Sequence, residues 1–230
     1  MSLDNAGPSA IFFDWDGTLV DSYAVLESAH NHTRRTLGFE ALGEGEFARY
    51  FGQPRDLLYN TLYPGKFDEA RTIFEQYYRS HHLEGIRVLP GVEDLLKHLA
   101  EVNMPCGVVT NKKADFIREE IRHLGWEAYF KAVVGAGDAV ADKPSPAPLQ
   151  LAIEKSGVKS NVQSILMVGD TENDILCASR TGCKAVLIVP LMEQNAVLKH
   201  CSSDFTFKNC EDFKEFLLQY LKKKIKGNDI

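Results

Sequence analysis

A short apolar run, residues 10–13, ends in two closely spaced carboxylates, Asp14 and Asp16, and this arrangement constrains the chain most. The run is brief and follows the turn-forming residues 7–9, so we expect a buried strand that stops at Asp14. Gly17 then allows a sharp turn. Two carboxylates this close repel each other unless a cation lies between them or one keeps its proton. A divalent ion with oxygen ligands resolves the repulsion, and Mg²⁺ suits carboxylates together with water and phosphate.

From residue 88 onward, helical and strand patterns alternate along the chain. Such alternation predicts a mostly parallel sheet covered by helices on both faces, which is a Rossmann-like α/β core. Residues 10–13 would be its first strand. Further strands are expected at 106–110, 131–135, 164–169, 184–189 and 204–207, and helices at 91–102, 114–124, 146–156, 172–181 and from about 212.

Residues 22–86 show only helical periodicity, which predicts an all-helical domain inserted into the core. The core would then comprise residues 1–21 and 87–230. His30 and His32 are interpreted as solvated helix residues. Helices are expected at 22–37, 44–51, 54–62 and 67–82, and the last carries an apolar stripe interpreted as core, namely Phe67, Ala70, Phe74, Tyr77, Tyr78 and His81.

Thr110 and Asn111 form a second polar group, and they follow an expected strand. In an open parallel sheet, ligands bind at the carboxyl ends of the strands. A phosphoryl group could be held there by the Thr110 hydroxyl and the backbone N–H of Asn111, which we expect to open the next helix. The alternative is that the two residues only cap that helix.

Lys143 is the third candidate, just before a proline-bracketed helix start. Pro144 restricts Lys143 to extended geometry and thereby directs its side chain. Its cation could offset charge on an aspartate and on a transferring phosphoryl group. The alternative is an exposed loop lysine.

Asp170 and Asp174 complete the set, because Asp170 ends a strand and Asp174 follows one helical turn later. Acids at i and i+4 share a helix face. Thr171 with Asp174 also fits a capping box, so Asp174 has a structural alternative. Asp170 has none, and we expect it to bind metal, with Asp174 as an outer ligand or as the group that orients metal-bound water.

The stretch DWDGTLVDS, residues 14–22, resembles the first motif of the haloacid dehalogenase superfamily in its phosphatase branch. All four groups resemble that family's motifs in order, and the helical insertion resembles the cap domain of its phosphoglycolate phosphatase and phosphoglucomutase branch. The resemblance implies a nucleophile at Asp14, a general acid/base at Asp16, a charge-offsetting Lys143, phosphoryl binding by Thr110 and Asn111, and a Mg²⁺ site of Asp14, Asp16, Asp170 and Asp174.

The function implied by the resemblance is a magnesium-dependent phosphatase that hydrolyses a small, phosphoglycolate-like monoester through an aspartyl-phosphate. A sugar-phosphate mutase, a pyrophosphatase or nucleotidase of the same superfamily, and a non-catalytic regulator remain alternatives. Leu26 stands where the mutases carry a cap histidine, and this disfavours the mutase. Arg55 either pairs with a substrate carboxylate or second phosphate, or faces solvent.

The formal net charge of −6 argues against nucleic-acid and anionic-membrane partners, which select for basic faces. The lysines of residues 222–226 are interpreted as cations near a helix C-terminus. Five cysteines without CxxC spacing indicate reduced thiols. Neither a run of about 18 apolar residues nor a signal-peptide pattern in residues 1–9 is found, so we expect a cytoplasmic protein. The resemblance implies a small phosphorylated substrate as its partner, and we expect a monomer or homodimer.

Overall fold

The computed structural model describes residues 7–189 and 201–226, with side chains as far as residue 219. Within this part, the chain divides into two compact units. One unit takes the residues up to Leu19 and those from Val88 onward, and the other is Val20–Arg87. Among the described helices, none combines the length and the apolar character needed to cross a bilayer.

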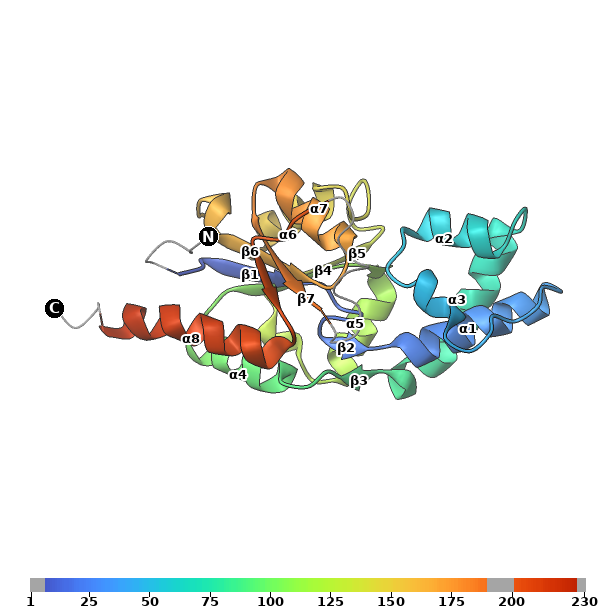
Figure 1. The fold of residues 1–230 in the computed structure, drawn as a ribbon, viewed down its shortest axis with the longest axis horizontal. Helices are drawn as coiled ribbons and strands as arrows, with labels where there is room; N and C mark the ends of the chain where they lie inside the picture. Colours follow the sequence, from blue (N-terminus) through green and yellow to red (C-terminus); the bar gives the residue numbers. More distant parts are fainter. Residues whose placement is uncertain (1–6, 190–200, 227–230) are drawn as a thin grey trace. The chain divides into compact units, whose positions relative to one another are not determined.

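The first unit is built on a six-stranded sheet (Figure 1). Its strands are β1 (Ala10–Phe13), β4 (Cys106–Lys113), β5 (Ala132–Ala136), β6 (Ile165–Gly169), β7 (Lys184–Ile188) and β8 (Phe205–Phe207). They lie in the order β5-β4-β1-β6-β7-β8, and each neighbouring pair is parallel. Counted along the chain, this is the order 3-2-1-4-5-6 of Rossmann folds. The predicted α/β core with a parallel sheet is confirmed.

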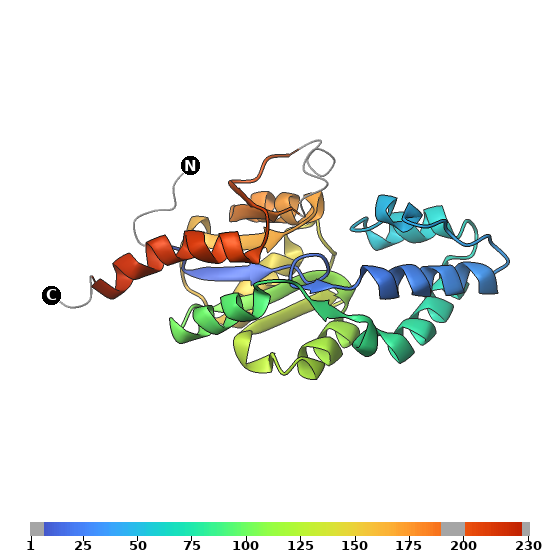
Figure 2. The ribbon, with the colours of Figure 1, turned by 60° about the horizontal axis from the view of Figure 1, so that its bottom comes forward.

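Helices cover both faces of this sheet (Figures 1 and 2). One face carries α6 (Ala147–Ser156), which packs on β4 and β5, and α7 (Glu172–Thr181), which packs on β6 and β7. The other face carries α4 (Val92–Glu101), α5 (Ala114–His123) and α8 (Cys210–Lys226). Because both faces are covered, β1 is buried along its whole length, as its short apolar sequence predicts. The predicted inward positions Tyr220 and Leu221 and the basic residues 222–226 lie outside the described side chains.

Strand β4 is longer than predicted and changes the expected role of Asn111. The strand continues to Lys113, with a register irregularity between Val109 and Lys113, and α5 begins only at Ala114. The prediction that Asn111 opens the next helix is therefore wrong. Because of this irregularity, β4 pairs with β5 at Val109 and again at Lys113, and polar residues of β4 lie between these two positions.

The second unit contains α1 (Tyr23–Thr36), a 3₁₀ turn η1 (Glu46–Arg49), α2 (Arg55–Leu62) and α3 (Phe67–Gly85). The helix predicted at 44–51 is reduced to η1, which begins after Gly45 in a left-handed conformation. Two short strands, β2 (Val20–Asp21) and β3 (Arg87–Val88), pair with each other where the chain enters and leaves the helices.

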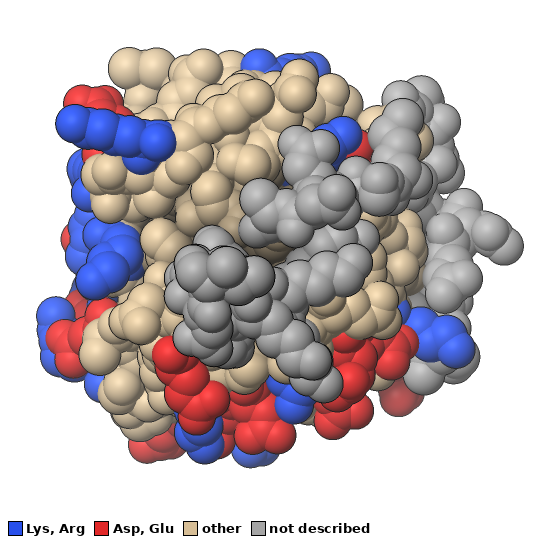
Figure 3. All heavy atoms as spheres, turned by 90° about the vertical axis from the view of Figure 1, so that its left-hand side faces the viewer, with Lys and Arg blue, Asp and Glu red and all other residues tan. Residues whose placement is uncertain are grey.

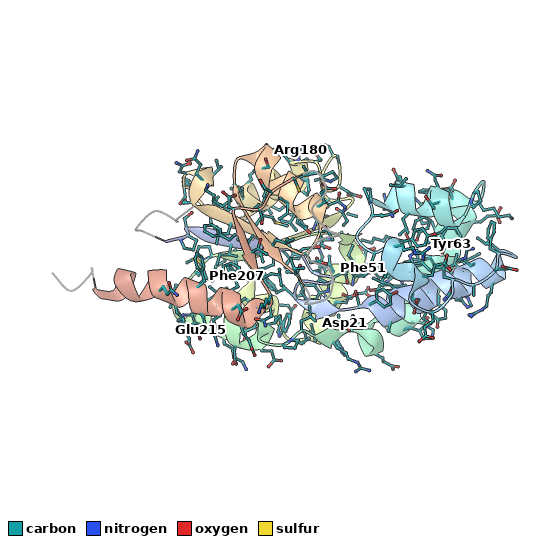
Figure 4. All side chains as sticks on the ribbon, in the orientation of Figure 1. Asp21, Phe51, Tyr63, Arg180, Phe207 and Glu215 are labelled. Carbon is teal, nitrogen blue, oxygen red and sulfur yellow. The ribbon has the colours of Figure 1, made fainter. Side chains whose placement is uncertain are left out.

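The interior of the helical unit is aromatic and includes a histidine that the sequence reasoning placed in solvent. His30 is buried, its Nδ1 lies 2.7 Å from the hydroxyl of Tyr63 (labelled in Figure 4), and its ring contacts those of Phe47 and Phe74. Burial, followed by the nearby charge of Arg34, lowers the pKa of His30 to about 3, so the ring is neutral.

The apolar row of α3 is also offset from the predicted stripe. Its fully buried positions repeat at every fourth residue, and the row therefore ends at His82, whereas His81 is exposed. His81 instead stacks on Tyr77 at a ring separation of 4.0 Å. The buried row is Ala70, Phe74, Tyr78 and His82.

Candidate active site

The candidate site lies where the carboxyl ends of three neighbouring strands meet. Asp14 directly follows β1, Thr110 lies in β4 on one side, and Asp170 follows β6 on the other. The chain proceeds from β1 to β4 and β5 and then crosses back to β6, so the connections leave β1 in opposite directions. Ligands of open α/β sheets bind at such a switch point.

The structure brings three carboxylates together at this point. Oxygens of Asp14, Asp170 and Asp174 all lie within 4.8 Å of one another. Two glycines permit this approach. Gly17 has φ +80°, and a Cβ there would overlap the Asp170 carboxylate; a Cβ at Gly169 would overlap the side chain of Asp174.

Lys143 lies between two of these acids. Its Nζ is 2.7 Å from Asp14 Oδ1 and 2.6 Å from Asp174 Oδ1, and its side chain is only 2% exposed. The alternative of an exposed loop lysine is therefore wrong. Asn111 fixes the backbone of Lys143, because its Oδ1 accepts the Lys143 N–H and its Nδ2 donates to the Lys143 carbonyl, both at 2.8 Å. The Asn111 side chain thus positions the lysine.

Asp174 forms the capping box that its sequence context predicts and also contacts Lys143. Its Oδ2 accepts hydrogen bonds from the backbone N–H of Thr171 at 3.0 Å and from the Thr171 hydroxyl at 2.6 Å, which is the carboxylate half of a capping box. Its Oδ1 accepts from Lys143. Both oxygens of Asp174 are thereby engaged, whereas Asp170 has one described bond, from the Thr18 hydroxyl to Oδ1 at 3.0 Å.

The electrostatics of the cluster favour a divalent cation. Burial, with the charge of Asp174 next, raises the pKa of Asp14 to about 7, and burial together with Asp14 raises the pKa of Asp170 well above its usual value. Although burial alone would lower it, the neighbouring Asp14 and Asp174 raise the pKa of Lys143. Two of the three carboxylates contact the Lys143 ammonium, whereas on the face in Figure 3 many acidic side chains lie beside basic ones. Oxygen donors with excess negative charge fit Mg²⁺, and Asp14 and Asp170 could hold it.

Asp16 is directed toward a second lysine. Its Oδ1 lies 2.7 Å from Nζ of Lys112, which is also 2.6 Å from Oε2 of Glu120. The same Glu120 oxygen accepts the indole N–H of Trp15 at 2.6 Å. Sequence reasoning missed Lys112, Glu120 and Trp15 as parts of the site. One signal was available: Glu120 falls in the apolar row of α5 that contains Phe116, Ile117 and Ile121.

The two remaining candidates, Thr110 and Arg55, lie in different units. Thr110 is buried in β4, and its Oγ1 accepts the backbone N–H of Lys112 at 3.2 Å. Arg55 is the first residue of α2, and its Nε lies 3.8 Å from Asp56 Oδ1 with 40% of the side chain exposed. The first unit therefore contains every predicted site residue except Arg55, which lies in the helical unit.

Comparison with known proteins gives a consistent result. A sequence model of the haloacid dehalogenase-like hydrolases matches residues 11–188. A phosphoglycolate phosphatase of Photorhabdus laumondii is 34% identical over 188 residues, which are 78% of this chain and 80% of that protein. The pyrophosphatase PpaX of Oceanobacillus iheyensis is 26% identical over 88% of this chain and 93% of its own. The crystal structure of a haloacid dehalogenase-superfamily hydrolase from Ehrlichia chaffeensis superimposes with a TM-score of 0.65 at 26% identity, covering 94% of this chain and 98% of that one.

Proposed function

This chain belongs to the haloacid dehalogenase-like hydrolase family, and from that premise we propose that it is a magnesium-dependent phosphatase that acts through an aspartyl-phosphate on Asp14. The observation that carries the proposal is the placement of Asp14 at the end of β1, with Lys143 2.7 Å away and the Asp170 carboxylate in the same cluster. A nucleophilic carboxylate, a cation and a pair of metal-binding oxygens are the parts that phosphoryl transfer requires.

In the first step, a carboxylate oxygen of Asp14 attacks phosphorus in line with the ester oxygen. The new bond joins Asp14 to phosphorus as the bond to the ester oxygen breaks, and Asp16 gives that oxygen a proton. Lys143 Nζ forms an ion pair with Asp14 Oδ1 at 2.7 Å, so Oδ2 is the proposed attacking atom. The lysine offsets the charge of two approaching anions without itself reacting.

In the second step, the Asp16 carboxylate takes a proton from water, and the resulting hydroxide attacks phosphorus. The bond between phosphorus and Asp14 breaks, which releases inorganic phosphate, restores the Asp14 carboxylate and leaves Asp16 protonated for the next cycle. Thr110, buried in β4, the strand that pairs with β1, is the hydroxyl proposed to hold the phosphoryl oxygens, together with the backbone N–H of Asn111.

Mg²⁺ would be held by Asp14, Asp170 and the backbone carbonyl of Asp16, and it would supply positive charge to a phosphoryl oxygen. Asp174 would not bind the ion directly, because its two oxygens already accept hydrogen bonds from Lys143 and Thr171. The raised pKa values of Asp14 and Asp170 support this assignment, since a nearby cation would offset the burial and the carboxylate repulsion that raise them.

The substrate proposed is a small phosphate monoester that carries a carboxylate, of which phosphoglycolate is the leading example. Support comes from the relatives named phosphoglycolate phosphatase and from Arg55, a half-buried guanidinium in the helical unit. We propose this unit as the cap that excludes water and reads the leaving group. The relative named pyrophosphatase makes pyrophosphate the second candidate substrate.

A phosphate-release assay tests the proposal. The full chain is given 2-phosphoglycolate, glycerol phosphate, nucleotides or pyrophosphate, each with Mg²⁺ and with EDTA. We expect release that requires Mg²⁺ and is fastest with 2-phosphoglycolate; no release from any ester would reject a phosphatase, and a preference for pyrophosphate would favour the second candidate.

The role of Arg55 needs a separate comparison. Arg55→Ala is expected to raise KM for 2-phosphoglycolate about tenfold or more while leaving KM for glycerol phosphate nearly unchanged, because a charged hydrogen bond contributes about 1.5–3 kcal/mol. Arg49→Ala is the matched control, since Arg49 is an exposed arginine in the same unit. Equal effects on the two esters would remove Arg55 from the substrate site.

A further inference from the structure

A buried chain of polar contacts leads from the core to the carboxylate of Asp16. The indole of Trp15 and the ammonium of Lys112 both donate to Oε2 of Glu120, and Lys112 also reaches Asp16. Trp15, Lys112 and Glu120 come from the turn after β1, from β4 and from α5, so three elements meet at the Glu120 carboxylate. An edge-to-face contact with Trp126 at 5.8 Å holds the indole in turn.

This arrangement is expensive for the fold. The side chain of Glu120 is 0% exposed and that of Lys112 4%, and burying an ion pair costs several kcal/mol per ion before the attraction between them is regained. Glu120 occupies a core-facing position of α5, where an apolar residue would pack without such a penalty. The Lys112–Glu120 pair is therefore not explained by a contribution to the stability of the fold. The residue that Lys112 contacts offers another explanation for its position.

That residue is Asp16, the proposed general acid/base. Asp16 is the end of the chain of contacts that reaches solvent, because its side chain is 18% exposed. Since Lys112 Nζ lies 2.7 Å from Oδ1, this contact restricts rotation of the Asp16 carboxylate. Lys143 is separate from this set, because its contacts are with Asp14 and Asp174.

We propose that Lys112, fixed by Glu120 and Trp15, is a positioning residue that aims Asp16 at the leaving ester oxygen. The inference rests on the proposed function. As the bond from Asp14 to phosphorus forms and the phosphorus–ester bond breaks, the proton on the Asp16 carboxyl group passes to the ester oxygen. The two lysines then have different duties: Lys143 serves the attack on every ester, and Lys112 serves the departure of alcohols that need a proton.

Leaving-group dependence distinguishes this role from simple structural support. A p-nitrophenolate leaves without a proton, whereas the alkoxide from 2-phosphoglycolate does not. The ratio of kcat for 2-phosphoglycolate to kcat for p-nitrophenyl phosphate therefore reports proton delivery. Both values come from one preparation, so a misfolded fraction cancels from the ratio.

We expect Lys112→Met to lower this ratio at least about tenfold, as part of the 10²–10⁴-fold that a positioned acid contributes. Glu120→Gln keeps an acceptor for Trp15 but loses the charge that holds Lys112, and it should lower the ratio less. Lys113→Met is the matched control from the next position of β4 and should leave the ratio unchanged. If Lys112→Met fails to fold, the double variant Lys112→Met/Glu120→Gln, which removes both buried charges, gives the same measurement.

An unchanged ratio in Lys112→Met or the double variant, with an active wild-type enzyme, overturns the positioning role and leaves the proposed function standing. An equal fall for both substrates does the same, because it indicates structural support only. A wild-type enzyme that releases phosphate from neither ester rejects the proposed function, and the positioning role with it.

Discussion

The two units bury ionisable side chains in opposite ways. At the carboxyl end of the parallel strands of the first unit, Asp14 and Lys143 form an ion pair within a cluster of three carboxylates. Inside the helical unit, His30 is packed among aromatic rings as a neutral group that bonds to a hydroxyl. The first unit thus buries an ion pair, whereas the helical unit buries His30 as an uncharged ring.

The difference indicates where a ligand can gain binding energy. A divalent cation bound as proposed to Asp14 and Asp170 would offset both the burial and the mutual repulsion of these carboxylates, which would favour its binding. A neutral aromatic interior offers no such gain, and we assign it to the stability of the helical unit. The predictions below separate the two interiors by changing one charge at a time.

The largest effect is expected for Asp14→Asn. An amide cannot serve as the nucleophile, so kcat should fall by at least about 10⁴-fold, comparable to the loss of a nucleophile in other enzymes. The fold should survive, because the substitution also removes like-charge repulsion with Asp170 and Asp174. Steady-state phosphate release and thermal unfolding of the same preparation measure both results. Wild-type turnover in this variant would end the nucleophile assignment.

A smaller loss is expected for Lys143→Met. Removing the ammonium leaves Asp14 and Asp174 facing each other in a buried site, so turnover should fall about 10²–10³-fold and the melting temperature should drop. Lys184→Met breaks the ion pair with Asp204, which is more exposed, and is the control. Equal losses in the two variants would mean that Lys143 contributes only stability.

Magnesium should stabilise the charged interior directly. At about 100 times its dissociation constant, a ligand that binds only the folded state adds about 2.7 kcal/mol to the free energy of unfolding. We therefore expect Mg²⁺ to raise the melting temperature of the wild type but not of Asp170→Asn. Asp138→Asn, which alters an acid paired with Arg118 elsewhere, should keep the shift. A shift that persists in Asp170→Asn would place the ion elsewhere.

The strand ends of this site could be predicted because each depends on a local pattern. A buried run followed by Asp14 or by Asp170 marks the carboxyl end of a parallel strand whatever the rest of the chain does. The strands β1 and β6 are neighbours, which brings the two acids together. Asn111 was misplaced because β4 continues past the point where its apolar run ends, and periodicity does not report such a continuation.

The partners of the buried charges could not be predicted, since they are remote in sequence. Lys143 reads as a loop residue until Asp14 and Asp174 are placed around it. His30 reads as solvated because its hydroxyl partner Tyr63 lies 33 residues away. Glu120 is a carboxylate in the apolar row of α5, and this exception is visible in the sequence. Nothing in the local pattern, however, identifies Lys112 as its partner.

The smallest effect is expected in the pH dependence of stability, where the two interiors should respond with opposite sign. The pKa of His30 is lower in the folded state, at about 3, than its ordinary value of 6.5, so the unfolded chain binds more protons between these values. Stability should therefore fall as the pH falls through this window, by at most about 1.4 kcal/mol for each pH unit. The pKa of Asp14 is raised to about 7, so acid between pH 7 and 4 should favour the folded first unit.

Two substitutions separate these slopes. His30→Gln removes the titrating group but keeps a hydrogen-bonding side chain beside Tyr63, so its free energy of unfolding should fall less steeply below pH 6.5 than that of the wild type. Asp14→Asn should fall more steeply, because it loses the opposing contribution. His32→Gln changes an exposed histidine on the same helix and should follow the wild type. Denaturant unfolding from pH 7 to 5 measures the slopes, and parallel curves for wild type and His30→Gln would show that His30 titrates alike in the folded and unfolded chain.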